Sequence, residues 1–159
     1  MTRFEKFIPI ILKNEGVLSD DVNDKGGLTK YGISQRAYPN LDIRNLTKAQ
    51  AEAIYKRDYF DKCKCDLIEE ELLALHLFDF AVNAGVARAI KKLQSLMILY
   101  ADGIIGKDTI EHANSAKWGN QFILLRKNYY KQIATGRNIT FLKGWLNRVD
   151  NTTKQLTIK

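Results

Sequence analysis

The sequence predicts a mainly α fold with a small β-hairpin subdomain near its N-terminus. Apolar residues recur at helical spacing along most of the chain, and one turn-rich stretch with β character, residues 17–33, interrupts that pattern. The chain has 159 residues, 45% hydrophobic and 27% charged, which is enough to bury a sizeable core and excludes a disordered or collagen-like chain. No apolar run approaches the roughly 20 residues of a membrane-spanning helix.

The first predicted element is an amphipathic helix that ends at Gly16. Pro9 lies inside it and predicts either a kink or a later start. Residues 17–27 are rich in turn formers and residues 28–33 have β character, so we expect a small hairpin or an irregular sheet there. The apolar stripe of the helix consists of Phe4, Phe7, Ile8, Ile11 and Leu12.

The rest of the chain is predicted to be helical. Thr47 followed by Gln50 is a capping box that opens a helix over 48–60. The later helices are separated by glycines and by short polar turns. They are expected over 69–84, 86–100, 107–115, 118–134 and 141–149.

Charge is unevenly distributed along the chain. Residues 1–79 hold 12 basic and 14 acidic side chains, a net charge of −2, whereas residues 80–159 hold 13 and 4, a net charge of +9. A basic half of this kind favours polyanions such as nucleic acid, an anionic membrane or a bacterial wall. The alternative is a solvated cationic face. No helix-turn-helix, zinc-finger or RNA-binding motif accompanies the charge, so nucleic acid is not the expected partner.

Three residues near the N-terminus could carry acid–base chemistry. Glu15 ends the first predicted helix, where the helix dipole and partial desolvation favour a protonated carboxyl able to act as a general acid. Asp24 on the following loop could activate water or stabilise positive charge, and the Thr29 hydroxyl could position that water, as glycoside hydrolysis requires. The alternative is an exposed Glu at a fraying helix end, with Asp24 as a turn residue.

Four ordered stretches of the chain resemble the glycoside hydrolase family 108 muramidases. This lysozyme-like group is common among phage endolysins and was formerly called secretion activator proteins. The four stretches are Glu15-Gly16, Asp24-x-Gly26-Gly27-x-Thr29-Lys30-Tyr31-Gly32-Ile33-Ser34, Ala51-x-x-Ile54-Tyr55-x-x-x-Tyr59-Phe60 and Phe78-Asp79-Phe80-Ala81-Val82-Asn83-Ala84-Gly85. The region from Asp102 to Val149 is similar to the predicted peptidoglycan-binding segment that follows the catalytic part in this group.

The resemblance implies a lysozyme-like α+β catalytic domain over residues 1–95 and a helical wall-binding segment over 96–159 packed on it. It implies hydrolysis of the β-1,4 bond between N-acetylmuramic acid and N-acetylglucosamine, with Glu15 as the acid and no metal or organic cofactor. The chain departs from the family pattern after Glu15, where Val17 and Leu18 replace the usual Gly and Tyr. Lys25 replaces the Pro of the Asp-Pro-Gly-Gly turn, which leaves the carboxylate of Asp24 in place.

Three further residues are expected at the substrate. Asp79 and Asn83 are four residues apart and share one helical face, from which they would line or brace the sugar cleft. Asn83 could equally bond local backbone at a helix end, whereas Asp79 lies between aromatic residues and needs a partner. The Tyr31 ring could stack on a sugar, as could helical tyrosines that are more often part of a core.

The expected biology follows from the same pattern. No signal peptide is recognised, so we expect a protein made in the cytoplasm that reaches the wall through a holin or another non-Sec route. We also expect a monomer. A prophage endolysin is the natural context. The rival interpretation is a non-catalytic peptidoglycan-binding or secretion-assisting protein that retained the fold, and the Val17-Leu18 departure gives it weight.

Overall fold

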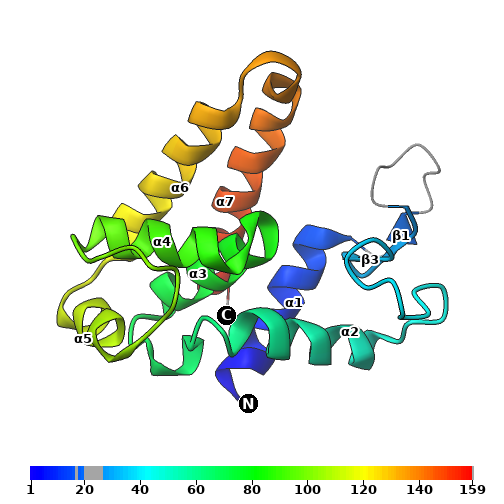
Figure 1. Cartoon of the computed structure of the whole chain (residues 1–159), viewed down its shortest axis with the longest axis horizontal. Coiled ribbons are helices and arrows are strands. Elements are labelled where there is room, and N and C mark those ends of the chain that lie inside the picture. Colours follow the sequence, from blue (N-terminus) through cyan, green and yellow to red (C-terminus); the bar gives the residue numbers. More distant parts are fainter. Residues whose placement is uncertain (17, 20–26, 159) are drawn as a thin grey trace. The chain divides into compact units, whose positions relative to one another are not determined.

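The structure, a computed structural model, describes residues 1–16, 18–19 and 27–158 (Figure 1). The chain divides into two compact units, Met1–Arg57 and Asp58–Lys159. We call the first the N-terminal unit and the second the helical unit. Within the described residues no helix has the length and apolar content to cross a membrane.

Helix α1 (Arg3–Glu15) opens the N-terminal unit. Thr2 caps it in a reciprocal capping box with Glu5, with N–O distances of 2.7 and 3.2 Å. The helix runs through Pro9, so the later start that Pro9 allowed is not seen. Gly16 ends the helix with φ +77°, in the left-handed region that glycine adopts readily. Glu15 is thereby the last helical residue, as predicted.

A three-stranded antiparallel sheet follows α1, in the order β1 (Leu18–Ser19), β2 (Thr29–Lys30), β3 (Ile33–Ser34). The turn between β2 and β3 has two central residues, Tyr31 and Gly32, both with positive φ (52° and 79°). Two positive φ values in a two-residue loop define a type I′ turn, whose twist matches that of the flanking strands. The paired residues are Leu18 with Lys30, Ser19 with Thr29, Thr29 with Ser34 and Lys30 with Ile33.

Helix α2 (Lys48–Tyr55) opens with the predicted capping box between Thr47 and Gln50. A single π-helical turn, Lys56–Phe60, continues it. Helical residues therefore span the predicted range 48–60, although the hydrogen-bonding pattern changes after Tyr55.

The helical unit is built around α3 (Glu71–Ala84), which packs against three other helices (Figure 1). Residues 73–81 of α3 are all buried, as expected of a helix that is apolar on every side. Its partners are α4 (Val86–Leu96), α6 (Gly119–Ile133) and α7 (Leu142–Thr157). Helix α5 (Lys107–Ser115) and two short 3₁₀ turns, Cys65–Leu67 and Gly136–Phe141, complete the unit.

Two helices end several residues away from their predicted ends. Helix α4 stops at Leu96 instead of residue 100, because Ile98 adopts φ +58°, a conformation that an α-helix cannot contain. Helix α7 runs to Thr157, well beyond the predicted end at 149. Its last turns are polar, and the buried Thr152 hydroxyl makes hydrogen bonds instead of apolar contacts. The apolar periodicity therefore stops before the helix ends.

The compact units do not coincide with the predicted domains 1–95 and 96–159. Helices α3 and α4 belong to the first predicted domain but pack with α6, and α3 also packs with α7, both from the second. The break in contacts lies instead at 57/58, inside the π-helical turn. The functional division at residue 95 stays a prediction.

Candidate functional site

Glu15 lies in a closely packed position in the N-terminal unit. It is half-buried at the end of α1, and the β2–β3 turn packs directly against its side chain. A Cβ atom added at Gly32 would lie 2.8 Å from the Glu15 Cβ and 2.9 Å from its Cγ. Only a glycine in this turn allows the hairpin backbone to approach the stem of Glu15 so closely.

Tyr55 holds the turn from the other side. Its ring is buried, and its hydroxyl donates a hydrogen bond of 2.7 Å to the Tyr31 carbonyl. The same hydroxyl would collide with a Cβ at Gly32. Tyr55 therefore belongs to the packed interior next to Glu15 and does not offer its ring for stacking. Its helical spacing left both sugar stacking and core packing open, with core packing the more frequent, and the hydrogen bond depends on a turn 24 residues away.

The hairpin supplies two more of the predicted residues. Thr29, in β2, is half-buried and its hydroxyl donates to the Gly27 carbonyl at 3.4 Å. Tyr31 is half-buried at the turn, with the Lys30 ammonium 5.8 Å from its ring centroid. The structure thus places Glu15, Thr29 and Tyr31 in one compact unit. Asp24, the predicted second carboxylate, lies outside the described residues.

Asp79 is fully buried in the helical unit. Arg126 donates to its carboxylate at 3.0 Å, Arg148 donates at 2.8 and 3.1 Å, and the Thr152 hydroxyl lies at 3.3 Å. Burial alone would raise the pKa of this carboxyl, but the two guanidinium groups hold the pKa well below its usual range. The partner that Asp79 was predicted to need is therefore a pair of arginines. Because the carboxylate is fully buried it does not line an open cleft, and a bracing role stays a prediction.

Asn83 extends the same set of contacts along α3. Its side-chain oxygen accepts a short hydrogen bond from the Tyr130 hydroxyl, which also lies 3.4 Å from Arg126. The residue is half-buried. Its amide thus bonds to α6, and contact with a substrate stays a prediction.

His76, which carried no motif in the sequence, is the central unpredicted residue of this cluster. Arg126 can only donate, so His76 Nδ1 accepts its hydrogen bond at 2.9 Å and Nε2 carries the proton toward Thr153, also at 2.9 Å. Burial, followed by the neighbouring Arg126 charge, lowers the pKa of His76 to about 3. Its partners are 50 and 77 residues away in sequence, so no local signal could have revealed the contact.

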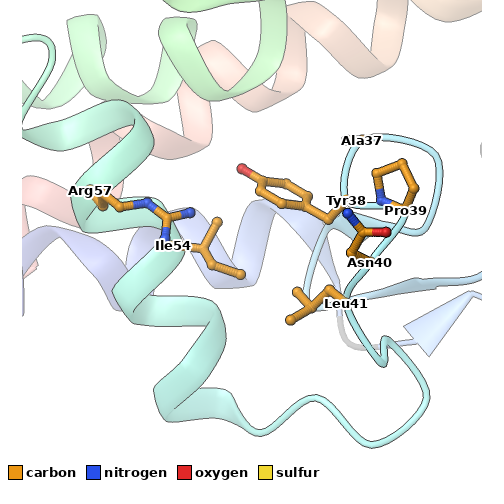
Figure 2. A pocket seen from close by; sticks show the side chains of 7 residues that line it. All are labelled: Ala37, Tyr38, Pro39, Asn40, Leu41, Ile54 and Arg57. Carbon is orange, nitrogen blue, oxygen red and sulfur yellow. The ribbon is translucent and has the colours of Figure 1, made fainter.

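A cavity of about 340 Å³ also opens in the N-terminal unit (Figure 2). The loop 37–41 forms one wall, and Ile54 and Arg57 form the other. Of these residues only Ile54 is a named position in a stretch that the sequence marked as family-like. Among the residues that the structure describes, no three His, Cys, Asp or Glu side chains gather in a way that could hold a metal ion.

Comparison with known proteins relates this geometry to a family. Residues 8–85 match the family model described as Glycosyl hydrolase 108. The solved structure of SagA from Brucella abortus shares the fold with a TM-score of 0.81 at 28% sequence identity, over 96% of this chain and 93% of that one. The predicted fold class, mainly α and lysozyme-like, is confirmed. A search of curated proteins found no match. The matched segment contains Glu15 and the hairpin, so over residues 8–85 this chain is similar to the glycosyl hydrolase 108 family.

Proposed function

We propose that the protein is a peptidoglycan hydrolase of the N-acetylmuramidase type, cleaving the β-1,4 bond between N-acetylmuramic acid and N-acetylglucosamine. The observation that carries the proposal is the half-buried Glu15 at the end of α1, held against the Gly32 turn in the family-matched segment. A general acid needs this combination of partial desolvation and fixed position, because it must reach the leaving oxygen in one defined geometry.

In this mechanism Glu15 donates its proton to the glycosidic oxygen as the bond to the anomeric carbon breaks. Positive charge then develops on the sugar ring, and a second carboxylate stabilises it or activates the water that adds to the anomeric carbon. We assign that carboxylate to Asp24 and assign positioning of the water to the Thr29 hydroxyl. Water supplies the hydroxyl of the new reducing end, and its remaining proton restores the acid.

The test is release of soluble fragments from purified peptidoglycan, identified by mass. Wild-type protein should release muropeptides with new N-acetylmuramic acid reducing ends. Glu15→Gln keeps the size and hydrogen-bonding reach of the side chain but cannot donate the proton. We therefore expect the rate to fall by about 10²-fold or more, with the fold and wall binding retained. A folded Glu15→Gln variant that works at the wild-type rate contradicts the mechanism.

Two variants test the assignment of Asp24 as the second carboxylate. Asp24→Asn should abolish most activity, whereas Asp20→Asn, a matched change four residues earlier in the sequence, should leave it intact, because only Asp24 falls in the family-like Asp-x-Gly-Gly stretch. Equal damage by both variants, with both folded, would reject Asp24 as the second carboxylate.

A second candidate function is a wall-binding protein without activity. The replacement of the usual Gly and Tyr by Val17 and Leu18 directly after Glu15 favours it. The same fragment assay separates the two functions, since binding to peptidoglycan without new reducing ends would support the non-catalytic candidate.

A further inference from the structure

The cavity beside the hairpin has a preformed wall. The loop 37–41 wraps around the side chain of Gln35, whose amide nitrogen lies 3.0, 3.2 and 2.8 Å from the carbonyls of Tyr38, Pro39 and Leu41. The Ser34 hydroxyl accepts from the Ala37 amide at 3.2 Å. With these bonds the loop is ordered before any ligand arrives, which removes an ordering penalty from binding.

Each wall of this cavity carries both apolar and polar side chains (Figure 2). Ile54 and Leu41 give an apolar surface, and the ring of Tyr38 extends from the loop toward the helical side of the cavity. Asn40 contributes an amide that can both donate and accept. Arg57 contributes a guanidinium, the group best matched to a carboxylate.

This combination suits an N-acetylated sugar that carries a negative charge. An acetamido methyl fits the apolar surface, the acetamido group matches Asn40, and the C–H face of a sugar ring packs on a tyrosine ring. A volume of about 340 Å³ is within the range of small-ligand sites. Arg57 then distinguishes an acidic sugar from a neutral one, because a neutral sugar offers the guanidinium no charge partner.

We propose that this cavity is a subsite for the muramyl unit, with Arg57 recognising the carboxylate borne on its lactyl arm, either directly or through an attached peptide. The inference rests on the proposed function, because it names the part of peptidoglycan that this cavity selects. Arg57 acts here as a specificity residue and takes no part in proton transfer.

The experiment is a titration of the full chain, carrying Glu15→Gln to prevent turnover, followed by backbone amide NMR shifts. The probes are N-acetylmuramic acid, N-acetylglucosamine and N-acetylmuramoyl-L-alanyl-D-isoglutamine. We expect shifts centred on residues 37, 38, 40, 41, 54 and 57, and a preference of about fivefold for the acidic probes, the size of a solvent-exposed ion pair. The two acidic probes distinguish a lactyl carboxylate from a peptide carboxylate.

Adding Arg57→Gln should abolish the preference and leave the affinity for N-acetylglucosamine unchanged. Arg36→Gln is the matched control, because Arg36 is an exposed arginine next to the same loop but does not line the cavity. The proposal is overturned if all three probes bind equally, if the preference survives in Arg57→Gln, if Arg36→Gln removes it as well, or if the shifts map to another surface.

These outcomes are independent of the proposed hydrolysis. If no reducing ends appear but Arg57→Gln abolishes the acidic preference, the hydrolytic function fails and the cavity stands as a muramyl-binding site. If Glu15→Gln abolishes fragment release while the preference persists in Arg57→Gln, hydrolysis stands and the subsite is rejected.

Discussion

At the scale of single residues, Gly32 determines how closely the hairpin approaches Glu15. It meets two requirements at once: a positive φ of 79° and the absence of a Cβ in a space already filled by Glu15 and the Tyr55 hydroxyl. The first requirement favours glycine by about 1–2 kcal/mol over other residues. The second cannot be met by any other residue unless the hairpin, or the end of α1, moves.

Gly32→Ala should therefore impair both stability and activity. We expect the free energy of unfolding to fall by about 2–4 kcal/mol from strain and overpacking together, and hydrolysis to fall more than the folded fraction explains, because Glu15 is displaced. Urea unfolding and the fragment assay measure the two effects.

The control for Gly32→Ala is Gly136→Ala, where φ is also positive (55°) but no atom lies within 4 Å of the new Cβ. Gly136→Ala should show the backbone strain without loss of activity per folded molecule. An equal loss of activity in both variants would mean that the close approach to Glu15 is unimportant.

At the scale of elements, a buried polar cluster joins α3, α6 and α7. Asp79 and His76 from α3 meet Arg126 from α6, and Arg148 from α7 completes the ion pairs. Such a cluster is stable only when every charge has its partner, so it favours one arrangement of the three helices over alternatives. The guanidinium of Arg126 also lies 5.1 Å from the Phe80 ring centroid, which adds a cation–π contact.

The cluster should make the protein less stable in mild acid. His76 is neutral in the fold with a pKa near 3 but has an ordinary pKa of 6.5 when unfolded, so the unfolded chain binds the extra proton between these values. The free energy of unfolding should fall by up to about 1.4 kcal/mol per pH unit as pH decreases through this window. Asp79, whose folded pKa is depressed, adds a loss only below its unfolded value of 3.8.

The variant that tests this pH dependence is His76→Gln, which can still accept from Arg126 and donate to Thr153 but does not titrate. Its free energy of unfolding, measured in urea from about pH 7 to pH 4, should depend on pH less steeply than that of the wild type. The difference in slope should correspond to roughly one proton. His112→Gln, a change at an exposed histidine on α5, should retain the wild-type slope. An unchanged slope in His76→Gln would exclude His76 as the acid-sensitive group.

The elements that local patterns determine were predictable, and those that depend on distant contacts were not. Helix positions were predictable because apolar periodicity and capping boxes are local, and Gly16 placed Glu15 at a helix end for the same reason. The arginine partners of Asp79 lie 47 and 69 residues away, so sequence indicated that a partner was needed but not which one. The packing of Gly32 against Glu15 and Tyr55 likewise depends on three separate elements meeting, which no single pattern encodes.

At the scale of the whole molecule, residues 80–159 carry a net charge of +9, and the structure shows which of their basic side chains lie together. Not every cation of this half is available, because Lys127 pairs with Asp150 at 2.7 Å. Three others, Arg88, Lys91 and Lys92, line one side of a cavity of about 500 Å³ along α4. We call these three residues the α4 basic groove. The Tyr129 ring lies 5.7 Å from the Arg88 guanidinium and 5.4 Å from the Lys92 ammonium.

The α4 basic groove should govern affinity for whole walls more than it governs turnover. Anionic wall polymers are attracted by converging charges, and the attraction is screened over about 8 Å at physiological salt. Replacing Arg88, Lys91 and Lys92 by Gln should therefore raise the apparent KM on wall suspensions several-fold, leave kcat on small soluble fragments unchanged, and flatten the dependence of KM on salt. The control replaces Lys131, Lys143 and Lys154, three exposed lysines outside the groove, and removes the same net charge. If both triple variants shift KM and its salt dependence equally, overall charge and not the groove determines wall affinity.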